Sequence, residues 1–193
     1  DNTAVAVVAY DSEREVLMLR AVDFLPAGRL DEKTASESLP YYDFIEAGYC
    51  IACGDLVIDY SAVEQYVMRI GDNYGCTVAA IGYDRYNCLS SAQKWEAEGY
   101  QTVEVRQHSS VLHSPTKRLK EMILSGRVEY RSNRLLEINF QNCRCSYDTN
   151  MNMYINKKRS AGKIDMVAAA LNAIYLVEQY ELLGEAEEWG GRW

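Results

Sequence analysis

Two long apolar runs open the chain, and they constrain its fold more than any other feature. Residues 2–10 (NTAVAVVAY) are rich in Val and Ala, residues 16–24 (VLMLRAVDF) are rich in Val and Leu, and a polar segment that includes residues 11–14 lies between them. Apolar runs of this length that flank a short polar segment predict a hairpin of two antiparallel strands. Because the first run is almost free of polar side chains, we expect its strand to be buried on both faces.

Helices and short strands alternate after this hairpin. Residues 28–47 are predicted to form two short helical pieces that Pro40 separates, because proline disfavours helix in the residue before it. Apolar spacing and capping residues predict the remaining elements. These are helices over about 62–70, 90–99, 114–126, 134–142 and 163–183, strands over 77–82 and 102–105, and a second hairpin over 144–156. The order of elements indicates a mixed α/β sheet flanked by helices.

Composition sets the class of protein. The 193 residues are 48% hydrophobic and 25% charged, which suits one globular domain over residues 1–193 with an acidic, frayed tail over 185–193. No apolar run approaches the roughly 20 residues of a membrane span, and no export signal is present, so we expect no membrane partner. The six cysteines are therefore expected to be reduced. The less favoured alternative is a zinc site whose four ligands are the thiolates of two cysteine pairs that are close in sequence. These pairs are Cys50 with Cys53 and Cys143 with Cys145.

Charge is distributed unevenly along the chain. The formal net charge is −8, yet residues 101–165 carry 12 Lys and Arg against 6 Asp and Glu, whereas the rest of the chain carries 8 against 22. A basic segment between acidic flanks fits a protein that contacts phosphate on one face. A solvated helix face around Lys117, Arg118 and Lys120 explains the same pattern equally well.

Two acidic residues are placed where chemistry is common in α/β folds. Asp84 follows the predicted strand 77–82, and Asp165 lies in the first turn of the long apolar helix. Either could be structural, Asp84 by capping a turn or pairing with Arg85 and Asp165 by complementing the helix dipole. If the two carboxylates converge, they repel unless a cation lies between them. Oxygen ligands of this kind suit Mg²⁺ or Mn²⁺, and two such ions can support phosphodiester hydrolysis.

Other chemistries find little support in the sequence. His108 and His113 are the two histidines, and neither has the spacing of a metal motif such as HExxH. The chain contains no Gly-x-Ser-x-Gly nucleophile turn, no Walker sequence and no GxGxxG. The sequence therefore gives no reason to expect a serine hydrolase or a nucleotide-binding loop.

Several segments, taken in order, resemble the nuclease domain of the large terminase subunit of tailed bacteriophages. The resemblance covers nearly the whole chain. The segments are Asp-x-Thr-Ala-Val (1–5), Ala-Ile-Gly-Tyr-Asp-Arg-Tyr-Asn (80–87), Ser-Pro-Thr-Lys (114–117), Asn142, Lys157-Lys158 and Lys-Ile-Asp-Met-Val-Ala-Ala-Ala-Leu (163–171). The resemblance implies an RNase H-like fold and a metal-dependent endonuclease that cuts concatemeric viral DNA during packaging.

Two family features are missing from this sequence. In the family, a strand that ends in an acidic residue, typically Asp-x-Ser, precedes the residue that matches Asp1 and forms the centre of the sheet. We therefore expect the chain to be truncated at its amino end and to lack the family's first metal-binding carboxylate. The amino-terminal ATPase of the family, with its phosphate loop, is also not in the sequence.

The resemblance assigns roles to particular residues. It implies that Asp84 and Asp165 bind Mg²⁺ or Mn²⁺, in total two ions, and that Asp1 supports them. Basic residues that would approach phosphate are Lys157, Lys158, Lys163, Lys117 and Arg118. The implied partners are double-stranded DNA, the ATPase domain of the same polypeptide, the portal and the small terminase subunit, in the cytoplasm of a bacterial host. The alternative is an RNase H-like module that binds DNA or a packaging partner without cutting.

Overall fold

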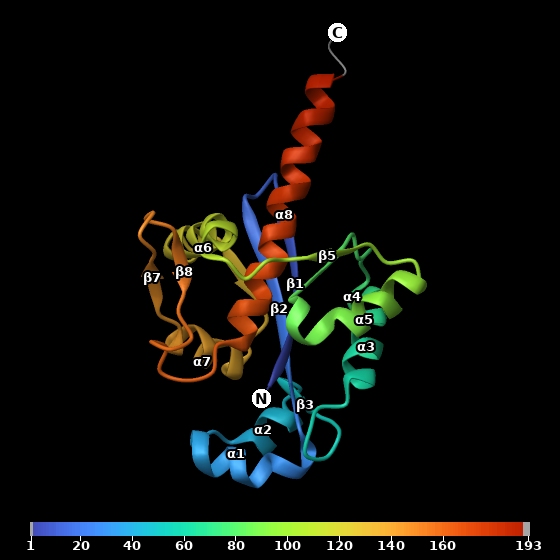
Figure 1. Cartoon of the computed structure of the whole chain (residues 1–193), viewed down its shortest axis with the longest axis vertical. Coiled ribbons are helices and arrows are strands. Elements are labelled where there is room, and N and C mark those ends of the chain that lie inside the picture. The colour runs from blue at the N-terminus through green and yellow to red at the C-terminus, as the bar shows by residue number, and fades with distance from the viewer. Residues whose placement is uncertain (1, 191–193) are drawn as a thin grey trace.

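The computed structural model describes residues 2–190, without the side chains of Asn87 and of residues 184–190 (Figure 1). The strands are β1 (Thr3–Asp11), β2 (Val16–Leu25), β3 (Cys50–Ala52), β4 (Ile81–Tyr83), β5 (Thr102–Glu104), β6 (Val128–Tyr130), β7 (Cys145–Tyr147) and β8 (Met153–Ile155). The helices are η1 (Ala27–Arg29), α1 (Leu30–Glu37), α2 (Tyr41–Glu46), α3 (Tyr60–Met68), α4 (Ile70–Tyr74), α5 (Arg85–Ala97), α6 (Ser109–Leu124), α7 (Arg134–Asn142) and α8 (Asp165–Gly190).

The predicted opening hairpin is confirmed and supplies the two longest strands of the main sheet. β1 and β2 pair antiparallel from Thr3 opposite Phe24 to Asp11 opposite Val16. On its other edge β2 pairs in parallel with β3 near one end and with β6 near the other. The expectation that β1 is buried on both faces is wrong, because its residues are half-buried along most of its length. Its second edge has no strand partner among residues 2–190.

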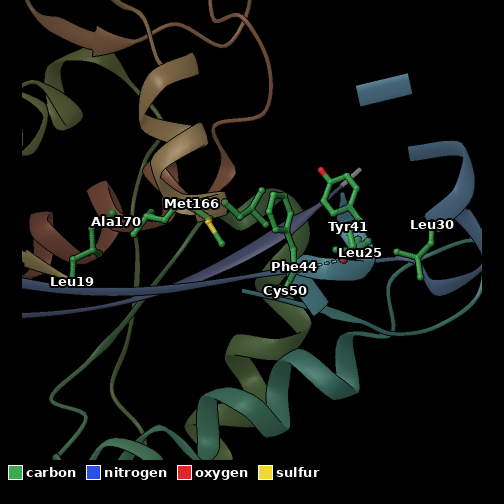
Figure 2. Packing of buried hydrophobic residues seen from close by; sticks show 10 residues of the cluster. Leu19, Leu25, Leu30, Tyr41, Phe44, Cys50, Met166 and Ala170 are labelled. Atoms are coloured by element: carbon green, nitrogen blue, oxygen red, sulfur yellow. Dashed lines mark hydrogen bonds between the residues drawn. The ribbon is translucent and has the colours of Figure 1, made fainter. Parts of the chain in front are cut away.

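Helices cover both faces of this hairpin. Along β1, Ala4, Ala6 and Val8 contact a core that includes Met166 and Ala170 of α8. Figure 1 shows α8 crossing the hairpin and extending past the rest of the molecule. Figure 2 shows how side chains from β2, α2, β3 and α8 meet in this core, which explains why residues 163–171 are so apolar.

The opposite face of β1 packs against a second group of elements. Val5 and Val7 contact a cluster that contains Val67 of α3 and Trp95 of α5. Beside this cluster β4 and β5 form a separate parallel pair. β4 also lies directly against α8, because a Cβ atom added at Gly82 would be 3.0 Å from Leu176 Cδ1 and 3.2 Å from the Asn172 carbonyl oxygen.

Helix starts differ most from the sequence-based expectations. α6 begins at Ser109, five residues before the predicted start at Ser114, because the His108 Nδ1 atom caps it by accepting from the Ser110 amide. Pro115 is thus inside the helix. α5 begins at Arg85 rather than at about residue 90, because Asp84 supplies its cap.

The carboxyl-terminal part of the chain is close to expectation. α7 has the predicted bounds 134–142, and β7 and β8 form the predicted second hairpin. Two short strands, β3 and β6, were not predicted. The tail expected to fray starts as helix, since α8 continues to Gly190, while residues 191–193 lie outside the described residues. Within the described residues, no helix has the length and apolar character needed to span a membrane.

Candidate active site

A groove of about 710 Å³ lies between β1 and β4, and we call it the inter-strand groove. The free edges of the two strands form its sides, since among residues 2–190 β1 pairs only with β2 and β4 only with β5. α8 lines one face through Ala169 and Ala173, and Val67 of α3 with Trp95 of α5 line the other. The groove thus has strand edges on two sides and helices on two faces.

Asp84 lies at the carboxyl end of β4, on the rim of this groove. Its side chain caps α5 by accepting a hydrogen bond from the Tyr86 amide at 3.2 Å, and the residue is exposed. The capping role that the sequence left open is therefore present. A cap uses one carboxylate oxygen, so the other remains available for a ligand.

Asp165 is the first residue of α8 and also lines the groove. Its side chain is 23% exposed, and its Oδ1 atom is 3.4 Å from the Lys157 ammonium. Lys157 lines the groove as well. The structure thus brings Asp84, Asp165 and Lys157 to one groove from three different elements.

Contacts along α8 show that the two acids are at the same end of the groove. The Tyr180 hydroxyl donates to the carbonyl oxygen of Ala79, just before β4, at 3.1 Å. Gly82, within β4, lies against Asn172, two turns nearer the start of α8. β4 therefore runs toward the start of α8, so Asp84 follows β4 in the direction of Asp165.

The chemistry of this end of the groove suits a divalent cation. Two carboxylates at the amino ends of two helices supply oxygen ligands of the kind that Mg²⁺ and Mn²⁺ prefer. The same helix ends favour an anion such as phosphate. In the part of the chain that the structure describes, no three His, Cys, Asp or Glu side chains form a group that could hold a metal. The two acids therefore fit such an ion but supply only part of a ligand set.

A third acid, Asp23 of β2, is buried near this site and was missed by the sequence analysis. It is 2% exposed, its Oδ2 atom accepts a hydrogen bond from the Asn2 side chain, and its Oδ1 atom has no partner. Burial, and to a smaller extent the negative charge of Asp165, raise the pKa of Asp23, whereas the Asn2 bond and the charges of Lys33 and Lys163 lower it. The net result is a pKa of about 8. One signal was available, because Asp23 is the single acid in the apolar run 16–24.

The basic residues predicted to approach phosphate occupy different surroundings. Lys158 follows Lys157 in an exposed loop beside Asp165. Lys163 is half-buried and acts electrostatically on Asp23 and Glu37.

Lys117 and Arg118, the two basic candidates on α6, lie away from Asp84 and Asp165. Lys117 is paired with Glu121 at 3.9 Å on the exposed face of the helix. Arg118 forms a two-bond pair with Glu181 and stacks on the Tyr10 ring at 4.6 Å, at the opposite end of β1 from Asn2. Neither residue lines the inter-strand groove. Asp1 lies outside the described residues.

Cys76 and Cys88 line the groove, whereas the four cysteines of the zinc alternative do not. All six are free thiols, with Cys50 buried in β3 and Cys145 exposed on β7, in a different sheet. A four-thiolate zinc site does not form among the described residues.

Comparisons with known proteins identify the family and the fold of the chain. The chain matches the family "Terminase large subunit, endonuclease domain" over residues 1–181. The crystal structure of the HK97 bacteriophage large terminase is similar with a TM-score of 0.82 and 21% identity, over 91% of this chain and 36% of that chain. The large terminase nuclease from thermophilic phage G20c gives a TM-score of 0.48 and 17% identity, over 61% of this chain and 62% of that chain. A search of curated protein sequences gives no match.

These findings confirm the fold that the resemblance implied. The chain spans about a third of the HK97 protein, and at 21% identity that likeness concerns the fold alone. The mixed sheet flanked by helices is RNase H-like.

Proposed function

This chain belongs to the terminase large-subunit endonuclease family, and from that premise we propose that it is a metal-dependent endonuclease domain acting on double-stranded DNA. The observation that carries the proposal is that Asp84 and Asp165, from separate elements, line the same end of one groove. Structural roles alone would not require the acid that caps α5 and the acid in the first turn of α8 to share this location. Asp84 also lies where reactive groups are expected in α/β folds, beyond the carboxyl end of a strand.

Asp84 and Asp165 would hold Mg²⁺ or Mn²⁺ in this proposal, with two ions in the complete site. When bound, such ions activate water and stabilise the departing oxygen of a phosphodiester. The chain's own contribution is to fix the carboxylates on rigid helix ends and to compensate their charge, as Lys157 does for Asp165. The exposed Lys158 beside it would contact DNA phosphate.

A further strand in the inter-strand groove would complete the site. It would pair with the open edges of β1 and β4, cover the apolar surfaces of α8 and α3, and end near Asp84. An Asp-x-Ser ending, typical of the family, would place a third carboxylate beside the first two. Asp1 would support the site, as the resemblance implies.

The biological setting follows from the family. We place the whole of residues 1–193 in one nuclease domain that cuts concatemeric DNA during packaging. Its partners would be an ATPase domain of the same polypeptide, the portal and the small terminase subunit, in the cytoplasm of a bacterial host. Arg118, held by Glu181 and Tyr10, fits this scheme as a structural residue better than as a DNA contact.

Plasmid nicking with Mn²⁺ tests the proposal. Two forms should be compared, the chain as given and the chain with an added amino-terminal strand that ends in Asp-x-Ser. We expect the extended form to nick, and Asp84→Asn or Asp165→Asn to abolish nicking while the fold is retained, since asparagine still caps α5 at position 84 and matches the size of aspartate at position 165. The matched control is Asp43→Asn, which removes an exposed carboxylate from α2.

The outcome separates two candidate functions. Nicking that survives both Asp84→Asn and Asp165→Asn would show that the assigned acids are wrong. An extended form that binds DNA and Mn²⁺ but never cuts would favour the alternative, a DNA-binding module without catalysis, for which the incomplete ligand set within residues 2–190 is the specific support.

A further inference from the structure

Backbone groups shortly before and directly after Asp165 are held by asparagine side chains from another helix. Asp165 lies between Ile164 and Met166, which are 3% and 0% exposed and anchor the start of α8 in the core. Figure 2 shows the Met166 side chain within this core. The first amides of a helix have no partner inside the helix and need one from elsewhere. Here the partner comes from α7.

Asn139 of α7 supplies that partner. Its Oδ1 atom accepts a hydrogen bond from the Met166 amide at 3.2 Å, and its Nδ2 atom donates to the Leu135 carbonyl oxygen at 2.9 Å. The residue is 2% exposed. Because both ends of the side-chain amide are bonded in a buried position, Asn139 cannot rotate without losing a hydrogen bond.

Asn142, nearly one turn further along α7, holds the segment before Asp165. Its Nδ2 atom donates to the Lys163 carbonyl oxygen at 3.2 Å, and its own carbonyl oxygen accepts from the Ala161 amide at 3.0 Å. A Cβ atom at Gly162 would be 2.7 Å from Asn142 Nδ2. This close approach explains why a residue without a side chain is found at position 162.

We propose that Asn139 and Asn142 are positioning residues that fix the Asp165 carboxylate for metal binding. Neither touches a reacting atom, and the inference rests on the proposed function, in which Asp165 is a ligand. Their spacing of three residues puts both on one face of α7, toward the start of α8. Residues that orient a metal ligand commonly change metal affinity 10- to 100-fold when removed.

Calorimetric titration of Mn²⁺ into the extended chain tests this inference. We expect Asn142→Ala to weaken Mn²⁺ binding about 10-fold while metal-free DNA binding and the melting temperature change little. Asn150→Ala, an exposed asparagine with no side-chain hydrogen bond, is the matched control and should leave Mn²⁺ affinity unchanged. Asn139→Ala should also speed hydrogen exchange at the Met166 amide, a readout that needs no metal.

A double-mutant cycle gives a second readout. Gly162→Ala should weaken Mn²⁺ binding in the parent chain, because its Cβ displaces the Asn142 side chain. In an Asn142→Ala background the same substitution should have little further effect, because the clashing atoms are gone. Additive losses would contradict the proposed contact.

The possible failures are distinguishable. If Asp165→Asn leaves Mn²⁺ affinity unchanged, the proposed function is wrong and the positioning role falls with it. If Asp165→Asn weakens binding while Asn142→Ala and Gly162→Ala do not, the function stands and the asparagines are only structural. Should Asn139→Ala fail to fold, the two variants at positions 142 and 162 still decide the matter.

Discussion

At the scale of single residues, Asp23 is the strongest departure from ordinary protein chemistry. It is a carboxylate buried between apolar strands, with one oxygen unpaired. The charged groups that act on it come from two helices and the loop before α8, and they favour opposite protonation states. They are Lys33 of α1, Asp165 of α8 and Lys163, with the neutral Asn2 at the start of β1. Burial outweighs the lysines, so a protonated acid is expected near neutral pH.

This protonation makes a prediction about stability. The folded pKa of about 8 lies above the ordinary value of 3.8, so between about pH 4 and pH 8 the folded state retains a proton that the unfolded state releases. The contribution of Asp23 to the free energy of unfolding is therefore fully present at low pH and is lost as the pH rises toward 8. The free energy of unfolding falls by at most about 1.4 kcal/mol per pH unit for this reason. Asp23→Asn should remove this slope.

Urea denaturation at several pH values checks the prediction. As the pH rises from 5 to 8, the free energy of unfolding of the parent should fall relative to that of Asp23→Asn. Asp43→Asn, at an exposed position, should give a difference that hardly changes with pH. A parallel pH dependence in the parent and Asp23→Asn would mean that Asp23 is ionised in the folded protein.

At the scale of helices and strands, the contact between β4 and α8 fixes the separation of the two candidate ligands. Gly82 allows this contact, since a side chain there would meet Leu176 Cδ1 and the Asn172 carbonyl oxygen. We expect Gly82→Val to lower the free energy of unfolding by about 1–3 kcal/mol through overpacking. It should also weaken Mn²⁺ binding, because Asp84 moves away from Asp165.

Denaturant unfolding and Mn²⁺ titration measure the two effects together. Val78→Ala, which removes apolar volume from the segment before β4, serves as a control of similar destabilisation. If the control weakens Mn²⁺ binding as much as Gly82→Val, the loss reflects stability rather than the spacing of β4 and α8.

Local sequence signals predicted some elements well and others poorly. The opening hairpin and α7 follow from strong, uninterrupted patterns, and Asp84 and Asp165 could be singled out by their positions after a strand and at a helix start. The start of α6 could not be predicted, because an unusual cap at His108 precedes a proline that normally marks a helix start. The role of Asn139 was equally hidden, because its partner amide is 27 residues away.

At the scale of the whole molecule, the basic segment 101–165 does not act as one surface. Several of its arginines and lysines are paired with acids elsewhere, for example Arg127 with Glu15 and Arg118 with Glu181. The exposed loop with Lys157 and Lys158 is the basic part that adjoins the two acids. Ion pairs with acids from other parts of the chain thus neutralise part of the positive charge of segment 101–165.

Replacing both loop lysines with alanine should weaken DNA binding equally for all duplex sequences. Because phosphate contacts release counterions, the slope of log affinity against log salt should fall by about 1–2. The measurement is fluorescence anisotropy at low salt with EDTA, so that metal binding does not contribute. The control, Arg14→Ala with Arg127→Ala, removes the same charge near the β1–β2 turn. An unchanged slope in the lysine variant would show that this loop faces no DNA.

The open edge of β1 also affects how the chain behaves in solution. Charged residues and prolines usually protect exposed strand edges from pairing with other molecules, but β1 has no proline and its one charged residue is its last, Asp11. Two copies could therefore pair edge to edge through the inter-strand groove. Sedimentation velocity should show self-association that grows with concentration, and an added strand in the groove should suppress it. A monomer at all concentrations would mean that the walls of the groove close on each other and shield the edge.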